Sequence, residues 1–552
     1  MARKNENVPQ YDYNIYRLPL GKVDDFINYI LERKFEEINI ADTLLPDKET
    51  VHCTLYFCDK DSANGSSWIN LLSDCAGVYL DSSVRIYGAA LVYRFTDVCY
   101  VISYGNAHFY INGFCDYDFG TEVAEHLLNM DNIKSQQNLS YGSKTSKTHV
   151  DYLSGATLTY GSGEVPNFIR GGSINEEDWG LNLNCGTSAQ FKWPEKPLNL
   201  VDRLQKLSIA LKEKSSYKLP RLLRLDAEKD AVKIHELNVK LAKAIKENDS
   251  SHSGSRINIP SFFLVGTKYF QNDFIGVKLT CNGKRRQYED ELTIPLLNSF
   301  ISDVGCNIEN DLTSINVSFL RADNLPTPLK PVLDYMEFIT DDNFCLRDGK
   351  WCSFNAAYLQ QIWNGLVNLK INNHVDDEFA YKSVEILEYA KNKGIYQNAT
   401  GNKAAQQYET YYNHFLADKL EAICNHPDLT QIDPREGGKY QVEPCDIYKD
   451  DKLYYVKLGA PNDFAYAIDQ VQLALSLIEK GNGSLTLKSG TVLYPKTVSL
   501  VLVFKDRKTT VAEWKDIKSV NFLLHLADLK RRINQSYVAL EVNLVYAQQA
   551  KD

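Results

Sequence analysis

One short stretch near the C-terminus places charged residues inside a strand-like pattern. Tyr440–Gly459 reads YQVEPCDIYKDDKLYYVKLG, two runs that resemble strands on either side of a charged turn. A turn centred on Asp450 and Asp451 predicts an antiparallel hairpin. In that register Asp446 and Lys457 share one face of the hairpin as diagonal neighbours, because side chains alternate across a strand.

Further oxygen-bearing side chains lie close in the sequence. Glu443 has the opposite parity from Asp446 and points away, unless Pro444 marks a one-residue bulge that turns Glu443 onto the same face. Glu409 and Asn413 lie one turn apart on a preceding helix and can add a carboxylate and an amide. The pattern therefore offers several hard oxygen ligands beside one lysine.

Carboxylates next to a lysine suit a divalent metal and a phosphodiester. Mg²⁺, or Mn²⁺ in its place, prefers oxygen ligands, for which Glu409, Glu443 and Asp446 are the candidates. The metal lowers the pKa of a bound water, and Lys457 can stabilise negative charge that develops on the phosphate. The structural alternative is a surface ion pair between Asp446 and Lys457, worth less than about 1 kcal/mol.

The elements expected to position these residues form a regular series. An amphipathic helix is followed by the hairpin, a helix that is apolar nearly all round, a continuous apolar strand typical of the centre of a parallel sheet, a further helix and a last strand. Their ranges are 403–424, 440–448 with 452–458, 463–480, 498–505, 520–533 and 537–547.

This order, with an acid on the first helix, an acid on one strand and a lysine on the next, resembles the PD-(D/E)XK nuclease superfamily. The resemblance implies a restriction-endonuclease-like α-β-β-β-α-β core and a Mg²⁺-dependent endonuclease. Matched residue by residue, Glu409 corresponds to the helix acid, Asp446 to the strand acid and Lys457 to the motif lysine. Gln470 corresponds to the polar residue that the following helix often carries.

The chain departs from the superfamily pattern at two places. The strand between the first helix and the hairpin is not evident, and Tyr455 stands where the acid two residues before the lysine belongs. Two alternatives follow. Glu443 replaces the missing acid, or the site is degenerate and the domain is a non-catalytic sensor or adaptor that binds nucleic acid or protein.

Most of the chain also resembles a sporadically distributed family of uncharacterised bacterial proteins that are often encoded in defence islands. The resemblance implies defence against phage or other foreign DNA. It implies nucleic acid as a partner, and a second copy of the chain or another defence component as a protein partner. The residues themselves do not distinguish DNA from RNA. The stretches that carry it are Cys115–Leu128, Asp348–Ile362, Tyr408–Lys419 and the hairpin.

Composition and charge limit the classes of protein to which the chain can belong. The chain has 552 residues and a net charge of −10, of which residues 401–552 contribute nothing because they hold 19 basic and 19 acidic residues. No apolar run approaches the roughly 18 residues of a membrane span, and the N-terminus lacks a signal-peptide pattern. Twelve cysteines without a C-x-x-C pair indicate reduced thiols in a cytoplasm.

We expect a multi-domain α/β protein of the α+β kind. The divisions expected from composition are an N-terminal mixed domain (1–198), a helical segment ending in a polar linker (199–256), a central mixed domain (257–402) and the nuclease-like domain (403–552). Within the first, Gly88–Phe95 and Val98–Gly105 predict a hairpin that turns at Thr96 and Asp97. The polar, glycine-rich residues 131–198 predict long loops or small strands.

Overall fold

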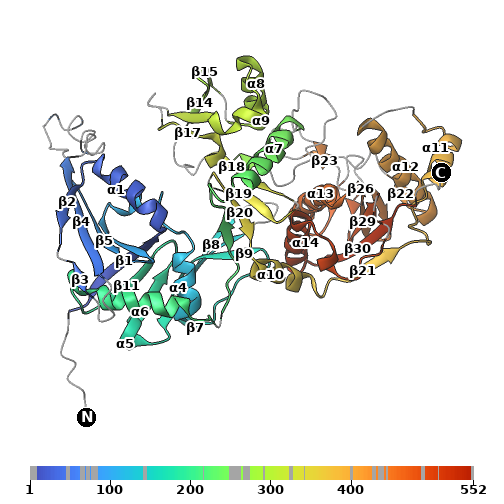
Figure 1. The fold of residues 1–552 in the computed structure, drawn as a ribbon. Coiled ribbons are helices and arrows are strands. Elements are labelled where there is room, and N and C mark those ends of the chain that lie inside the picture. The colour runs from blue at the N-terminus through green and yellow to red at the C-terminus, as the bar shows by residue number, and fades with distance from the viewer. Residues whose placement is uncertain are drawn as a thin grey trace, which may run out of the picture. The chain divides into compact units, whose positions relative to one another are not determined.

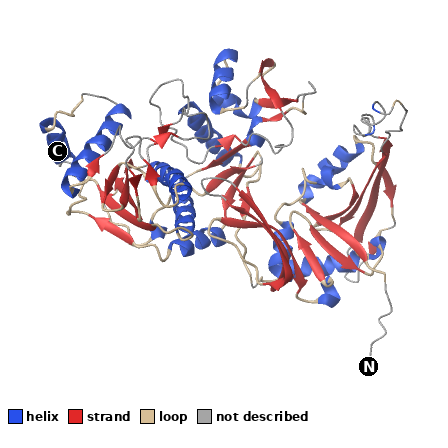
Figure 2. Cartoon of the chain, turned by 180° about the vertical axis from the view of Figure 1, so that it is seen from behind, coloured by secondary structure: helices blue, strands red, loops and turns tan. Residues whose placement is uncertain are grey.

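The computed structural model shows a mixed α/β protein with several antiparallel and mixed sheets (Figures 1 and 2). The structure describes residues 9–61, 69, 75, 77, 85–140, 146–247, 263–264, 274–321, 327–397, 402–424, 431–432, 441–442, 445–486 and 492–548, apart from 41, 45–49, 216, 290–291, 341, 348, 506 and 508. Among these residues, no helix is both long and apolar enough to cross a membrane.

The chain forms two compact units. The first comprises residues 1–139, 146–160 and 164–219, and the second comprises 140–145, 161–163 and 220–552. The finer four-part division drawn from composition stays a prediction. Most of the expected linker at 247–256, and most of the expected boundary at 398–402, lie outside the described residues.

The first unit is built on one large sheet, in the order β2-β4-β5-β6-β1-β11-β10-β9-β7-β8 with β3 beside β4. Its strands are β1 (Tyr11–Leu18), β2 (Glu36–Asn39), β3 (Thr43–Leu44), β4 (Thr50–Asp61), β5 (Arg85–Arg94), β6 (Cys99–Gly105), β7 (Leu128–Ser140), β8 (Ser146–Ala156), β9 (Glu164–Ser173), β10 (Asn182–Cys185) and β11 (Ala189–Trp193). Its helices are α1 (Val23–Leu31), α3 (His108–Ile111), α4 (Phe119–Leu127), α5 (Glu176–Trp179) and α6 (Val201–Lys212).

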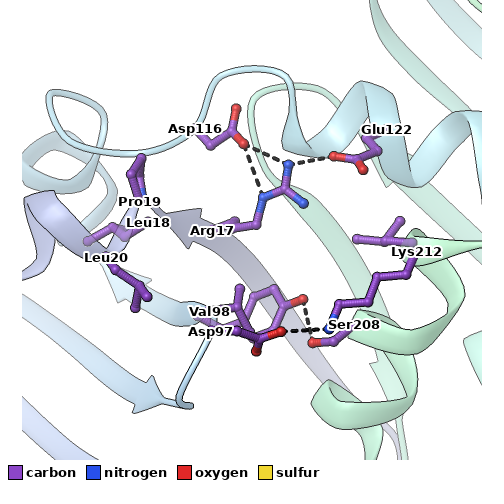
Figure 3. A pocket seen from close by; sticks show the side chains of 12 residues that line it. Arg17, Leu18, Pro19, Leu20, Asp97, Val98, Asp116, Glu122, Ser208 and Lys212 are labelled. Atoms are coloured by element: carbon purple, nitrogen blue, oxygen red, sulfur yellow. Dashed lines mark hydrogen bonds and ion pairs between the residues drawn. The ribbon is translucent and has the colours of Figure 1, made fainter. Parts of the chain in front are cut away.

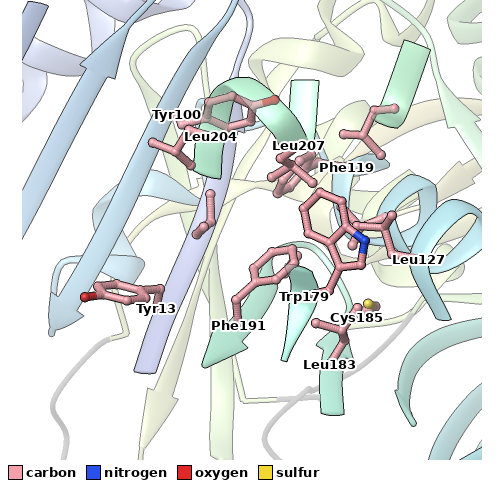
Figure 4. Packing of buried hydrophobic residues seen from close by; sticks show 14 of the residues in the cluster. Tyr13, Tyr100, Phe119, Leu127, Trp179, Leu183, Cys185, Phe191, Leu204 and Leu207 are labelled. Carbon is pink, nitrogen blue, oxygen red and sulfur yellow. The ribbon is translucent and has the colours of Figure 1, made fainter. Parts of the chain in front are cut away.

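Alternating apolar side chains give this sheet two buried faces. One face packs against α1 and α3, and the other packs against α4 and α6. Figure 4 shows the core between the sheet and helices α4 and α6, in which Phe191 and Trp179 lie among leucines from the helices. The hairpin expected here is confirmed, because Arg94 pairs with Cys99 across the β5–β6 turn.

The expectation of long loops or small strands in residues 131–198 is confirmed only for the small strands β10 and β11. These residues form the long strands β7, β8 and β9 as well as β10 and β11. The glycines that suggested loops instead permit close approach: a Cβ on Gly171 would lie 2.8 Å from the carbonyl oxygen of Asn132 on β7. Glycine inside a strand marks such an approach as often as a turn.

The second unit begins with two small sheets, β15-β14-β16-β17 and β12-β20-β19-β18-β13. Their strands are β12 (Leu222–Arg224), β13 (Phe263–Leu264), β14 (Phe274–Cys281), β15 (Lys284–Tyr288), β16 (Asn316–Arg321), β17 (Lys330–Pro331), β18 (Met336–Ile339), β19 (Phe344–Arg347) and β20 (Lys350–Phe354). A shared apolar core joins them to α7 (Ala231–Glu247), α8 (Ile294–Val304) and α9 (Ile308–Asp311).

A third sheet, in the order β21-β30-β29-β26-β25-β22, carries the residues of chemical interest. Its strands are β21 (Ile371–His374), β22 (Ile423–Cys424), β25 (Ile447–Lys449), β26 (Lys452–Gly459), β29 (Thr497–Phe504) and β30 (Ala539–Tyr546). Two short hairpins accompany it, β23 (Gln431–Ile432) with β24 (Gln441–Val442) and β27 (Leu485–Thr486) with β28 (Val492–Leu493). β29 pairs in parallel with β26 and β30, as its continuous apolar run predicts.

Helices cover both faces of this sheet. The face with Val456 and Leu458 packs against α11 (Ser383–Asn392) and α12 (Asn402–Leu420). The other face carries Phe504, which contacts Phe464 of α13 (Pro461–Lys480). α14 (Val520–Ile533) packs beside α13, and α10 (Ala356–Leu366) packs beside α14. The third sheet is therefore buried on both sides, and a polar site can open only at its edges or strand ends.

Candidate active site

Strand β26 extends beyond the end of its neighbour β25. Ile447 pairs with Tyr454, and the Asp446 amide still donates to the Tyr454 carbonyl at 2.9 Å. Among the described residues no strand covers this edge of β26 beyond that point. Backbone groups of alternate residues face the same edge, so the N–H groups of Val456 and Leu458 need other acceptors.

Two carboxylates supply these acceptors. Asp446 accepts the Val456 N–H on Oδ2 at 2.7 Å, and Glu409 of α12 accepts the Leu458 N–H on Oε2 at 3.2 Å. Amides two residues apart lie about 6.7 Å apart along a strand. The uncovered edge thus brings acids from two separate elements to one short stretch of backbone.

Lys457 lies between these two amides in the sequence and joins the same cluster. Its Nζ lies 3.2 Å from Glu409 Oε1, and the two side chains are only 5% and 15% exposed. The structural alternative placed Lys457 in an ion pair at the surface, whereas the lysine is almost fully buried. The hairpin register alone did not predict Glu409 as its partner, since Glu409 lies 48 residues earlier.

Asn413 lies on the same helix as Glu409, one turn further on. α12 runs antiparallel to β26, because Glu409 contacts Leu458 while the Leu420 carbonyl accepts a hydrogen bond from Lys449. Asn413 is therefore about 6 Å closer to the hairpin turn than Glu409. Its Oδ1 is buried, and the described residues contain no hydrogen-bond partner for it.

The two other expected site residues are not joined to this cluster. Glu443 lies outside the described residues, as does Pro444, so the bulge that would turn Glu443 inward stays a prediction. Gln470 lies half-buried on α13, which covers the opposite face of the sheet from α12. Among the described contacts, none links Gln470 to Glu409 or Asp446.

The cluster offers the kind of oxygen atoms that a hard divalent cation prefers. Glu409 and Asp446 supply carboxylate oxygens, and the buried amide oxygen of Asn413 has no hydrogen-bond partner among the described residues. Mg²⁺ and Mn²⁺ take such oxygen ligands and keep several waters, so two or three protein ligands suffice.

A second cluster of charged residues lies in the first unit, around a hollow of about 330 Å³ (Figure 3). Arg17 of β1 donates to Asp116 at 2.7 Å and also to Glu122, and Lys212 donates to Asp97 at 2.6 Å. Each cation is thus neutralised by an acid. The hollow therefore suits a structural ion-pair network better than an anion-binding site.

This ion-pair network includes two acids from a stretch whose structural role was not evident from the sequence. Asp116 and Glu122 belong to Cys115–Leu128, one of the stretches that carry the family resemblance. In the same hollow, burial raises the pKa of Tyr100 to about 12, so its hydroxyl stays protonated while it bonds to Ser208 at 2.9 Å. The acids in this stretch were the signal from which an ion pair could have been predicted. The sequence does not reveal their partner, because Arg17 is 99 residues away from Asp116.

The fold and the cluster define a multi-sheet α/β protein with an acid–lysine cluster at the edge of a mixed sheet. The chain belongs to a family of unknown function (DUF6119), whose model matches residues 13–465. The match includes α12 and the β25–β26 hairpin and ends before Gln470. It confirms membership of a family without a known activity and shows no link to nucleases. No curated protein and no solved structure matches the chain significantly.

Proposed function

We propose that residues 403–552 form a metal-dependent nuclease domain that hydrolyses phosphodiester bonds in defence against foreign DNA. The observation that carries the proposal is the convergence of Glu409, Asp446 and Lys457 on the uncovered edge of β26. Acids and a lysine that meet where two strands separate are the arrangement expected of a PD-(D/E)XK site.

The order of elements supports the same proposal. β22 follows α12 and pairs antiparallel with β25, so it supplies the strand that the sequence pattern did not reveal. With the short hairpins β23–β24 and β27–β28 set aside, the series α12-β22-β25-β26-α13-β29 matches the α-β-β-β-α-β order expected of a restriction-endonuclease-like core. The first helix and the second lie on opposite faces of the sheet, as that architecture requires.

Each residue has a definite role in this proposal. Glu409 and Asp446 would hold Mg²⁺ or Mn²⁺, with Asn413 as a further oxygen ligand. The bound metal would supply a water of lowered pKa. The hydrogen bonds from Val456 and Leu458 fix the orientation of the two carboxylates, and the Lys457 ammonium is positioned to stabilise negative charge on a phosphate oxygen.

Asp446→Asn is the sharpest test. An asparagine oxygen still accepts the Val456 N–H, so the fold is kept while the charge is removed. We expect Mg²⁺-dependent cleavage of plasmid DNA to fall at least about 100-fold, in line with the loss of one electrostatic contributor. EDTA should abolish cleavage, and Asp450→Asn in the exposed hairpin turn should leave it unchanged. Wild-type cleavage that survives EDTA and Asp446→Asn would contradict the proposal.

One observation favours a second candidate, a non-catalytic domain that binds nucleic acid. Lys457 is buried against Glu409, and both carboxylates already hold backbone amides, which is also what a purely structural cluster would look like. This candidate predicts binding of DNA or RNA without cleavage, and no effect of Asp446→Asn on that binding. Assaying plasmid DNA, single-stranded DNA and RNA in parallel separates the two candidates.

A further inference from the structure

Two cysteines of the second unit, far apart in sequence, lie in direct contact. Cys281 ends β14 and is buried, while Cys306 follows the end of α8 and is half-buried. Their Sγ atoms are 2.7 Å apart. The two thiols are therefore close enough to bond after a small shift, since a disulfide has a length of about 2.05 Å.

The backbone holds both cysteines in place. Cys281 precedes the tight Asn282–Gly283 turn into β15, where both turn residues have positive φ. Cys306 follows Gly305, the left-handed residue that ends α8, and its amide donates to Ile301 at 3.1 Å. The end of strand β14 and the end of helix α8 thus hold the two thiols close together.

Cys306 is accessible, whereas Cys281 is not. A hollow of about 560 Å³ opens beside Cys306, lined by polar side chains that include Lys246, Asn298 and Ser302. The pKa of Cys281 is raised to about 12, mainly because the thiol is buried. The hydrogen bond with Cys306 and the charge of the Cys306 thiolate contribute to the same shift. A small oxidant therefore reacts with Cys306 first, while Cys281 stays buried as a protonated thiol.

We propose that Cys281 and Cys306 are a redox pair that forms a reversible disulfide, with Cys306 as the thiol oxidised first by a peroxide. The Cys306 thiolate attacks one peroxide oxygen, an S–O bond forms, the O–O bond breaks and hydroxide leaves. The Cys281 sulfur then attacks the Cys306 sulfur, its proton passes to the departing hydroxide, the S–S bond forms and water leaves. The two thiols lose two electrons and the peroxide gains them.

A zinc site at the same place is the competing interpretation. The ligand atoms of Cys281, Cys306 and Asp311 lie within 4.8 Å of one another. However, two thiolates on one tetrahedral zinc lie about 3.8 Å apart for Zn–S bonds of about 2.3 Å, well beyond the contact seen here. The Asp311 carboxylate is also engaged, because it accepts from Asn282 at 3.0 Å and from the Asn307 amide at 2.9 Å.

The first test maps disulfides in the full-length wild-type protein, so it does not depend on a variant that folds. After hydrogen peroxide, alkylation and proteolysis, mass spectrometry should find the Cys281–Cys306 cross-link, and dithiothreitol should remove it. Cys345 and Cys352 are a matched control: they lie opposite each other across β19 and β20, both buried, and should stay reduced.

The order of reaction is tested with single variants. Cys281→Ser should accumulate a Cys306 sulfenic acid that dimedone traps, while Cys306→Ser should leave Cys281 unmodified. Cys281→Ala serves the same purpose if the serine disturbs the core. Absence of the cross-link in peroxide-treated wild type would overturn the proposal. So would stoichiometric zinc in the purified protein that is lost in both serine variants.

Discussion

At the scale of single residues, Glu409 and Lys457 form a buried ion pair. Both side chains are nearly excluded from solvent, and the Glu409 carboxylate also accepts the Leu458 amide. Removing water from two charges is expensive, and their attraction offsets that expense only while both partners are present. The pair is therefore a point at which single substitutions and a double substitution should differ sharply.

We predict that Glu409→Gln and Lys457→Met each destabilise the protein by about 3 kcal/mol, because each leaves one charge buried without its partner. The double variant should be more stable than the Lys457→Met single variant, since no uncompensated charge remains. Urea denaturation of the four proteins, read as a double-mutant cycle, measures this coupling. Strictly additive effects would mean that solvent already screens the pair.

At the scale of elements, Gly120 is the contact through which α4 packs on the turn between β10 and β11. A Cβ at this position would lie 2.1 Å from the Gly186 carbonyl oxygen and 2.5 Å from that of Ser188. Both atoms belong to the backbone, so no side chain can move aside. The glycine in the family stretch Cys115–Leu128 thus has a steric reason.

We predict that Gly120→Ala destabilises the protein by about 1–3 kcal/mol, even though alanine favours a helix, because the helix must shift away from the turn. Gly113→Ala is the matched control, since a Cβ there would meet nothing within 4 Å. Thermal unfolding of both variants tests the prediction. Equal melting temperatures for the two would show that α4 adjusts freely.

A second prediction at this scale concerns pH. Asp342 accepts from Lys240 of α7 at 2.9 Å. Burial opposes the shift, but hydrogen bonds from Lys240 and Thr340 lower the pKa of Asp342 to about 2. A depressed carboxyl pKa contributes stability above its unfolded value near 4, and this stability is lost as the pH falls to about 2.

Asp342→Asn should therefore lower the free energy of unfolding at pH 7 by less than about 1 kcal/mol, because the pair is largely exposed. The difference between variant and wild type should vanish as the pH falls from 4 to 2. Urea titrations at several pH values measure it. A difference that persists unchanged at pH 2 would assign the effect to packing instead of charge.

At the scale of the whole molecule, charge distribution limits how nucleic acid can be bound. Residues 401–552 are neutral, and the rest of the chain carries the net −10. Affinity for a polyanion depends on cations that displace counterions from phosphates. We predict weak binding of DNA or RNA with a shallow dependence on salt, measured by fluorescence anisotropy over a salt series. A steep slope, which signals the release of many counterions, would reveal a basic groove.

Much of the element order could be predicted because it depends on local patterns. The alternation in Tyr440–Gly459 and the two aspartates of the turn determine the hairpin register, and Asp450 and Asp451 both have the positive φ that such a turn requires. The unbroken apolar run of β29 indicates a strand buried on both faces. These features follow from neighbours in the sequence, so no long-range information is needed.

The glycine-rich residues 131–198 show where local patterns mislead. Their glycines indicated long loops or small strands, yet Gly171 lies inside the long strand β9, which needs it to approach Asn132 of β7. The short strand β22 was missed for a related reason: two residues carry too little periodicity to be recognised, and only pairing with β25 makes them a strand.

The sequence by itself determined most of the C-terminal helices and strands, the hairpin register and the set of acids and the lysine that could do chemistry. Only the tertiary structure decided that Lys457 is buried against Glu409 and that two carboxylates accept the amides at the edge of β26. It alone brought Cys281 to Cys306. The physical reason is common to all three: a side chain's partner and its exclusion from water depend on how distant elements pack, and residue spacing carries no record of that packing.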